Sequence, residues 1–453
     1  VDEHIGLLNA ALAALLHVDS IPLSVTNNVF GMAWVMGIVL VPAVFFLTAG
    51  PMRAIDPSLE EAARMSGAGT WRIFRRINTP LLMPSILGAL IYTFITAVSI
   101  FEIPALLGAA GGKVPVLATD VFYAVRPVGP STSYAYGAAG VYGLALAVPS
   151  LIALLFYLRL LDRAERFQVV TGKSYQTRDT DLGVLTWLGL GFVILYLLLA
   201  LALPLLVLLW ASVLPVLQMP SAEMLRRITS QNYHSLFITL GSAGIVANTV
   251  VLVIVVAILT TFFSFMISWV VVRTRLSQRK LVDMLSLAPH AIPGLAFAFA
   301  LAMLGILATK WAAWLPFAGT MVVIVLADLV TRLPYATRMG NAALVQIHPA
   351  LEESAQTSGA PNRRILWHIL LPLIRPTIVY SLVWTGLLTF QEVSMALFLA
   401  GPNNRVLSVA VFQLWQAGNT GQAAAGTIVM AAILGIVTFL ILKATKGVIA
   451  STK

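Results

Sequence analysis

The sequence predicts an all-α fold, a polytopic transmembrane helical bundle with two pseudo-equivalent halves. Of its 453 residues, 59% are apolar and only 10% are charged, and the mean hydropathy is +0.92. Ordinary soluble domains are about 25% charged, so this composition excludes that class. The apolar residues gather in runs of about 20, the length that a helix needs to cross a hydrocarbon core of about 30 Å. A polar segment between these runs occurs twice.

Nine of the apolar runs are long enough to cross a bilayer. We predict spans at about residues 29–50, 81–101, 136–160, 182–214, 238–272, 284–306, 319–337, 373–399 and 423–442. The amphipathic stretch at 5–16 is expected to lie along the bilayer surface. The protein is therefore expected to be a multi-pass membrane protein.

The repeated segment keeps one spacing. Glu61-Ala62-Ala63-Arg64-Met65-Ser66-Gly67 returns as Glu353-Ser354-Ala355-Gln356-Thr357-Ser358-Gly359, and Ile77 and Pro80 return as Ile369 and Pro372. Each matched pair lies 292 positions apart, so one spacing has been copied rather than four coincidences assembled. A shift of 290 also aligns Val116-Leu117 with Val406-Leu407. The last three predicted spans of each half therefore correspond.

The repeat predicts a division of the chain. Residues 1–161 form part of a first half with its polar segment at 56–80, 162–181 form a basic linker, and 182–453 form a second half with its polar segment at 348–372. The second half has three spans before its copy of the shared unit. Since the chain opens at Val1 without such spans, three N-terminal spans are expected upstream, which would make twelve in all. A repeat that is asymmetric by nature is the alternative.

Charge indicates the orientation. If the spans alternate in direction, both repeated segments, the linker and the C-terminal tail lie on one side. That side holds 22 of the 28 lysines and arginines, counting Arg332 and Arg375 at the ends of spans. The positive-inside rule places this side in the cytoplasm. The same distribution accounts for the net charge of +10, so nucleic acid is not an expected partner. The absence of cysteine excludes disulfides and cysteine metal sites.

Each repeated segment is predicted to form a helix-turn-helix elbow. Residues 59–66 are good helix formers, Gly67 can adopt the positive φ that ends a helix, and Thr70 can cap a second short helix. Apolar residues follow among arginines, and they serve either as anchors for a partner protein or as packing within the elbow. These residues are Trp71, Ile73 and Phe74 in the first copy and Ile365, Leu366 and Trp367 in the second.

The paired segments resemble the EAA loop of ABC-transporter membrane subunits. The resemblance implies that a dimer of ABC ATPase subunits contacts the permease at both copies. The implied coupling residues are Glu61, Ala62, Ala63, Gly67, Trp71, Ile77, Pro80, Glu353, Ser354, Ala355, Gly359, Trp367, Ile369 and Pro372. The chain departs from the family pattern at Thr79, where Leu is usual, and at Ser354, where Ala is usual.

Further stretches resemble the fused, two-half permeases of ferric iron importers. They are residues 59–87, 101–108, 168–173, 289–294 and 333–338. The resemblance implies the fold of a type I ABC importer permease in a bacterial inner membrane. It also implies an extracytoplasmic substrate-binding protein as a partner, with ferric iron as the cargo. Fused permeases for thiamine, aminoethylphosphonate and polyamines look similar and remain alternatives.

No catalytic constellation is expected on this chain. Thr171-Gly172-Lys173-Ser174 resembles the end of a phosphate-binding loop, but Phe167 stands where that motif needs glycine, and the segment lies in a linker. We therefore expect no enzyme activity and no bound cofactor, with ATP used by partner subunits. A secondary transporter driven by an ion gradient is the alternative of another class. It would have no use for two matched docking elbows.

Three ionisable residues near the predicted membrane are candidates for the substrate path. Glu102 and Glu392 occupy corresponding places after matched spans, and His290 lies in a span interrupted by Pro289 and Pro293. Ionisable groups in a membrane are costly and mark function by default. The alternative for the two glutamates is that each braces the backbone after its helix. Asp328 has Arg332 four residues on, which predicts a structural pair.

Overall fold

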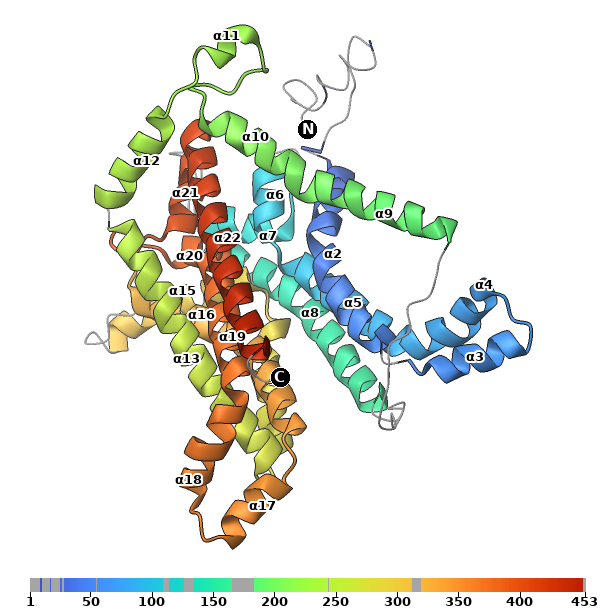
Figure 1. The fold of residues 1–453 in the computed structure, drawn as a ribbon. Helices are drawn as coiled ribbons and strands as arrows, with labels where there is room; N and C mark the ends of the chain where they lie inside the picture. The colour runs from blue at the N-terminus through green and yellow to red at the C-terminus, as the bar shows by residue number, and fades with distance from the viewer. Residues whose placement is uncertain are drawn as a thin grey trace. The chain divides into compact units, whose positions relative to one another are not determined.

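The computed structural model describes residues 28–53, 55–108, 114–125, 134–164, 183–242, 244–311 and 319–450, with isolated positions at 9, 17, 25 and 26. Every regular element in this described part is a helix (Figure 1). The predicted all-α class is confirmed. The amphipathic stretch 5–16 and the segment 171–174 lie outside the described residues.

Contacts divide the chain into two compact units, residues 1–205 and 206–453. The boundary between them falls within α10 (Leu203–Ser212). The predicted linker at 162–181 lies outside the described residues except for its first three positions, which end α8. The division into 1–161, 162–181 and 182–453 therefore stays a prediction.

The first unit packs long apolar helices around shorter ones. α2 (Val29–Arg53) contacts α5 (Thr79–Ser99) and α6 (Glu102–Leu107), and α8 (Tyr136–Ala164) contacts α5 and α7 (Leu117–Val125). The polar elbow between α2 and α5 consists of α3 (Pro57–Met65), α4 (Thr70–Ile73) and the π-helical turn η1 (Phe74–Asn78). α9 (Val184–Leu197), followed by η3 (Leu198–Ala202), belongs to this unit, and its Tyr196 hydroxyl donates to the Ile38 carbonyl oxygen at 3.4 Å.

The second unit is organised around α13 (Ile245–Arg273), which packs on α16 (Met321–Gln346) and α19 (Leu371–Phe390). α17 and α18 form a tip beyond these long helices in Figure 1. The remaining elements are α11 (Ala222–Leu225), α12 (Gln231–Ser242), α14 (Arg279–Leu287), η4 (Ala288–Ala291), α15 (Gly294–Trp311), α17 (Ala350–Thr357), α18 (Asn362–Ile365), η5 (Leu366–Leu370), α20 (Ser394–Leu399), α21 (Leu407–Gln416) and α22 (Thr420–Ala450).

Small residues bring α13 and α16 close together. A Cβ on Gly340 would lie 2.4 Å from the Ser268 hydroxyl oxygen, so only glycine fits there. The Ser268 hydroxyl donates to the Thr337 carbonyl oxygen at 3.0 Å. Small residues and interhelical hydrogen bonds of this kind are typical of helix contacts in membranes, where no hydrophobic force distinguishes helix from lipid.

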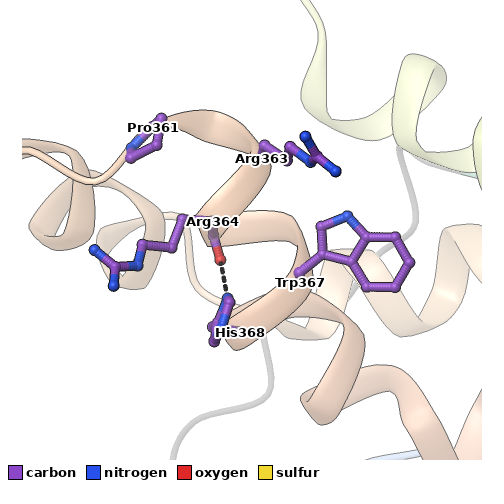
Figure 2. Close-up of a pocket in the computed structure, with 5 residues that line it drawn as sticks. All are labelled: Pro361, Arg363, Arg364, Trp367 and His368. Carbon is purple, nitrogen blue, oxygen red and sulfur yellow. Dashed lines mark hydrogen bonds between the residues drawn. The ribbon is translucent and has the colours of Figure 1, made fainter.

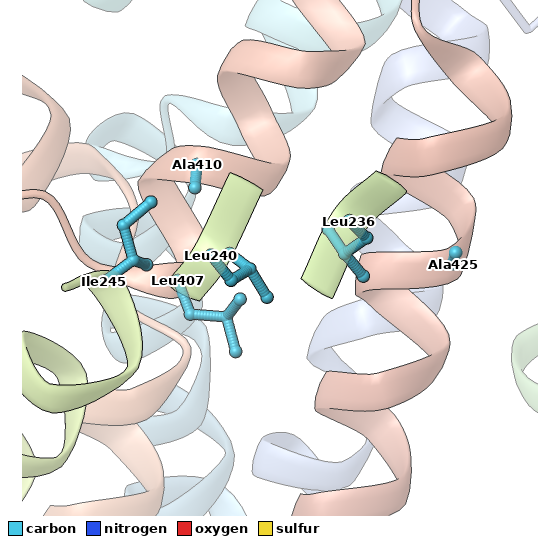
Figure 3. Close-up of a cluster of buried hydrophobic side chains, with 6 residues drawn as sticks. All are labelled: Leu236, Leu240, Ile245, Leu407, Ala410 and Ala425. Atoms are coloured by element: carbon cyan, nitrogen blue, oxygen red, sulfur yellow. The ribbon is translucent and has the colours of Figure 1, made fainter. Parts of the chain in front are cut away.

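A buried apolar cluster joins α12, α13, α21 and α22 (Figure 3). Leu236 and Leu240 from α12 pack against Leu407 and Ala410 from α21 and Ala425 from α22. Ile245, at the start of α13, completes the cluster after a break at Gly244, whose φ is +62°. The predicted span 238–272 therefore consists of the end of α12 and nearly all of α13.

In the described residues, seven helices are long and apolar enough to cross a membrane, where nine spans were predicted. One missing span, 284–306, is interrupted: α14 with η4 meets α15 at an angle of 98°, and this pair would count as an eighth span. The other, 319–337, belongs to α16, which is long enough but carries Asp328, Arg332 and Arg338. Arg332 therefore lies within a helix and not at a span's end.

The two units repeat a series of elements in the same order. α3, α4, η1 and α5 of the first unit correspond to α17, α18, η5 and α19 of the second, and α6, α7 and α8 correspond to α20, α21 and α22. The two π-helical turns, residues 74–78 and 366–370, lie 292 positions apart. The copied spacing in the sequence is thus a copied structure.

Candidate functional site

The first elbow is a short helix closed by a left-handed glycine. The Asp56 carboxylate caps α3 by accepting a hydrogen bond from the Ser58 amide at 2.9 Å. At the other end Gly67 has φ +78°. The Ala68 amide donates to the Ala63 carbonyl oxygen at 3.0 Å, which is the long bond of a Schellman motif.

The second elbow has the same geometry. Gly359 has φ +80°, and the Ala360 amide donates to the Ala355 carbonyl oxygen at 3.0 Å. The predicted positive φ is therefore confirmed in both copies. The predicted cap is wrong: the residue that precedes α4 is Gly69, and Thr70 is the first residue inside the helix, with no side-chain cap bond.

The two elbow helices turn matching faces outward. Glu61 and Glu353 are exposed, whereas their neighbours Glu60 and Glu352 are half-buried. Among the other predicted coupling residues, the exposed ones are Ala62, Gly67, Trp71, Pro80, Ser354, Gly359, Trp367 and Pro372, and the half-buried ones are Ala63, Ile77, Ala355 and Ile369. The same helix therefore offers one glutamate outward and holds the other inward.

The apolar residues after the glycine differ in their exposure to solvent. Ile73 and Ile365 are each 3% exposed, so they pack within their elbows. Trp71 is 73% exposed and stacks on Phe74 with 5.7 Å between ring centroids, and Trp367 is 60% exposed. The tryptophans remain accessible to a partner, and the isoleucines do not.

An inward glutamate makes a polar contact in each elbow, to a membrane span in the second elbow and within the elbow itself in the first. In the second elbow, Glu352 Oε1 lies 2.6 Å from Nε of Arg273, the last residue of α13. In the first, Glu60 Oε1 accepts a hydrogen bond from Asn78 Nδ2 at 2.9 Å. Sequence reasoning missed these residues. The copied Leu-Glu-Glu at 59–61 and 351–353 carried the signal, because adjacent helix positions face in different directions.

A second site is a buried charge cluster between α16 and the start of α20. Arg332 lies 3.4 Å from Asp328 and forms an ion pair with Glu392. Its guanidinium also donates to the Leu388 carbonyl oxygen at 3.3 Å. The other Glu392 carboxylate oxygen accepts a hydrogen bond from the Met395 amide at 3.1 Å. The predicted pair of Asp328 with Arg332 is confirmed.

Glu392 therefore has the contacts of a brace, since it holds the first turn of α20 and the side of α16. Glu102, its counterpart, is the first residue of α6 and belongs to the first unit. His290 lies in η4 at the bend, where its Nδ1 is 3.3 Å from the Tyr335 hydroxyl. In the described residues, no three His, Asp or Glu side chains are grouped as a metal site would need.

The part of the chain that the structure describes has seven candidate spans, a duplicated helical unit and a matched elbow in each copy, which together define a multi-pass membrane component with two related halves. The chain belongs to the family described as "Binding-protein-dependent transport system inner membrane component", whose model matches residues 7–170 and 261–447. The two matches each cover one elbow. The predicted inner-membrane location is confirmed.

Ferric transport permeases are among the similar proteins. The chain is 26% identical over 420 residues to the ferric transport system permease protein FbpB of Actinobacillus pleuropneumoniae, covering 90% of this chain and 58% of that protein. It is 26% identical over 384 residues to the putative ferric transport system permease protein FbpB 1 of Haemophilus influenzae, covering 84% of this chain and 58% of that protein. The chain thus spans little more than half the length of these relatives.

Among solved structures, a bacterial ABC transporter involved in the import of the acidic polysaccharide alginate has a chain 21% identical to this one. It matches with a TM-score of 0.47, over 58% of this chain and 95% of the other.

Proposed function

We propose that this chain is the permease subunit of an ATP-driven ABC importer of the type I kind, and that each elbow binds one subunit of an ATPase dimer. The single observation that carries the proposal is the duplicated elbow, with the same left-handed glycine and the same outward glutamate in both copies. Two equivalent docking points match a two-subunit motor. A carrier driven by an ion gradient has no need of them.

The elbows would act as levers. ATP hydrolysis on the partner subunits would move α3 and α17, and Glu61, Glu353, Trp71 and Trp367 would be the contacts through which that movement arrives. The ion pair between Glu352 and Arg273 supports this role in the second unit, because it ties α17 to a membrane span. Movement of the elbow would then tilt α13 and alternate the side on which the substrate path opens.

Ferric iron is the proposed cargo. Its support is the similarity to ferric transport permeases over 90% and 84% of this chain. Glu102, Glu392 and His290 are the proposed path residues, and an extracytoplasmic binding protein would deliver the iron. Thiamine, aminoethylphosphonate and polyamines remain the alternative cargoes.

Reconstitution tests the proposal. The permease is placed in proteoliposomes with its ATPase and binding protein, and uptake of radiolabelled ferric iron is followed with and without ATP. We expect ATP-dependent uptake that is lost in the double variant Glu61→Arg/Glu353→Arg. Glu223→Arg is the matched control, because Glu223 is also an exposed glutamate in a helix, and its uptake should be unchanged.

Two results would contradict the proposal in different parts. Uptake driven by an ion gradient without any ATPase would overturn the ABC assignment. ATP-dependent uptake of thiamine, aminoethylphosphonate or spermidine in place of iron would keep the ABC assignment and overturn the cargo.

A further inference from the structure

An apolar groove of about 310 Å³ runs along the second unit between α13 and α19. Phe262, Met266 and Trp269 from α13 and Ile374, Ile378 and Leu382 from α19 line it. Phe265, Leu344 and Ile374, which also line it, form a buried apolar cluster. The walls are almost wholly apolar, so the groove suits a hydrocarbon and not an ion or a sugar.

The groove has the length of one bilayer leaflet. Its lining runs from residue 258 to 269 on α13 and from 371 to 382 on α19, which is about 16 Å on each helix at 1.5 Å per residue. Half of a hydrocarbon core is about 15 Å. Both α13 and α19 belong to candidate spans, so this surface lies at membrane depth.

A basic pocket of about 490 Å³ lies at the elbow end of the groove. Arg363, Arg364, Trp367 and His368 line it together with Pro361 (Figure 2). Trp367 lines both the pocket and the groove. Trp367 therefore lies where the apolar groove meets the basic pocket, and tryptophan favours such a position at a membrane interface.

We propose that this combined surface binds an anionic phospholipid of the cytoplasmic leaflet. One acyl chain would lie in the groove, and the phosphate would lie in the basic pocket beside Arg363, which points to the same side of the elbow as Trp367 (Figure 2). The Arg363 guanidinium would form charge-assisted hydrogen bonds to the phosphate, and Arg364, which points to the other side, would add to the positive charge of the surface. Basic pockets beside spans on the cytoplasmic side suit such headgroups. The proposal depends on the membrane location and on the cytoplasmic orientation, and not on ATP-driven import.

The first elbow lacks the groove's apolar floor at the matching positions. Asn78 and Thr79 stand there in place of Leu370 and Leu371, and the Asn78 amide is bonded to Glu60. We therefore expect a lipid at the second elbow only. Lipid would hold η5 and α19 against α13 at the base of this elbow, and would contact the part of Trp367 that lines the groove.

Quenching of tryptophan fluorescence by brominated lipid tests the proposal. The purified permease is placed in phosphatidylcholine nanodiscs that contain increasing amounts of dibrominated phosphatidylglycerol or, separately, dibrominated phosphatidylcholine. The quenching that disappears in the Trp269→Phe variant reports the groove. We expect phosphatidylglycerol to occupy the groove at a concentration about fivefold lower than phosphatidylcholine for each contributing arginine.

Variants locate the site. Arg363→Ala/Arg364→Ala should abolish the preference for phosphatidylglycerol, and Ile378→Phe, which narrows the groove without adding a fluorophore that the assay detects, should reduce quenching by both lipids. The matched control is Arg75→Ala/Arg76→Ala in the first elbow, which should keep the preference. Helical circular dichroism and gel filtration establish that each variant is folded.

Equal quenching of wild-type protein by the two lipids, or a preference that survives Arg363→Ala/Arg364→Ala, would overturn the proposal. Loss of ATPase binding in Arg363→Ala/Arg364→Ala with the lipid preference intact would also overturn it, and would assign the basic pocket to the ATPase.

Discussion

Arg273 and Glu352 connect the second elbow directly to a membrane span. The two side chains meet at 2.6 Å, and the Arg273 guanidinium also donates to the carbonyl oxygens of Leu344 and Ile347, at 2.8 and 2.7 Å. One residue thus gathers the end of α13, the end of α16 and the start of α17. The lever that we propose for transport begins at this point.

Glu352 and Glu353 are adjacent, so the ion pair of Glu352 with Arg273 can be tested separately from the exposed Glu353, which is proposed to contact the ATPase. Glu352→Gln removes the charge that pairs with the half-buried Arg273, and we expect it to lower the free energy of unfolding by about 1.5–3 kcal/mol, the range for hydrogen bonds to charged groups. Glu353→Gln changes an exposed side chain and should leave stability within about 0.5 kcal/mol of wild type. Thermal unfolding of the detergent-solubilised permease measures both.

Transport should order these two variants differently. Glu353→Gln should weaken ATPase binding, whereas Glu352→Gln should keep binding and lose ATP-dependent uptake. If Glu352→Gln is as stable and as active as wild type, the ion pair neither stabilises the protein nor transmits movement from α17 to α13. Another contact would then have to transmit that movement.

The elbow turn depends on the left-handed glycines. A Cβ on Gly67 or Gly359 would touch nothing within 4 Å, so any penalty there comes from the backbone conformation and not from crowding. Gly359→Val should cost about 1–2 kcal/mol locally and misplace α18, because a left-handed conformation is unfavourable for residues with a Cβ and most so for branched ones. We expect uncoupling, with ATPase activity no longer producing uptake.

Asparagine provides the control for this prediction. It enters the left-handed region more readily than other residues with a side chain, so Gly359→Asn should keep most of the uptake that Gly359→Val loses. Equal activity in the two variants would show that the turn does not need a positive φ during transport.

The left-handed glycine and the ion pair between Glu352 and Arg273 differ in how well they could be predicted from the sequence. The glycine was predictable, because a helix-forming run followed by Gly allows few conformations. The ion pair was not predictable, because Glu352 and Arg273 lie far apart in the chain and no local sequence pattern links them. The buried cluster divides in the same way: Asp328 with Arg332 follows from helical spacing, whereas Glu392 joins them only through the packing of α16 against α20.

The span count shows a further limit of local reasoning. Apolarity alone joined α12 to α13 and α19 to α20, since the breaks at Gly244 and Gln391 interrupt direction without interrupting hydrophobicity. It also counted 284–306 as one span interrupted by Pro289 and Pro293, but it could not predict that the helices on the two sides of the break meet at 98°. Residue type reports how apolar a segment is, and the path of the backbone depends on what it packs against.

The buried charge cluster of Asp328, Arg332 and Glu392 is predicted to depend strongly on Arg332 for its stability. Asp328 is fully buried, and Arg332 is the cation that its carboxylate and that of Glu392 share. Arg332→Met would leave two carboxylates without this partner, and we expect a loss of about 3–5 kcal/mol, the cost of breaking a buried pair. Thermal unfolding and the yield of folded protein in the membrane are the measurements.

A compensating change tests the origin of that cost. Glu392→Gln added to Arg332→Met removes one of the two carboxylate charges and should restore part of the lost stability. If the double variant is no more stable than Arg332→Met, the damage comes from lost packing and not from uncompensated charge.

Glutamine and alanine substitutions at Glu392 separate a path role from a brace. Gln carries no charge but can still accept the hydrogen bond from the Met395 amide. Ala carries no charge and cannot accept this hydrogen bond. A brace alone predicts that Glu392→Gln keeps its uptake and that Glu392→Ala loses it. A cation path predicts that Glu102→Gln and Glu392→Gln together reduce ferric uptake by about tenfold, or roughly 1.4 kcal/mol, and that uptake of a zwitterion such as aminoethylphosphonate, where measurable, is affected less. Because the contacts of Glu392 with Arg332 and Met395 already account for its position, unchanged ferric uptake in the double Gln variant would assign Glu392 to bracing and remove both glutamates from the proposed path.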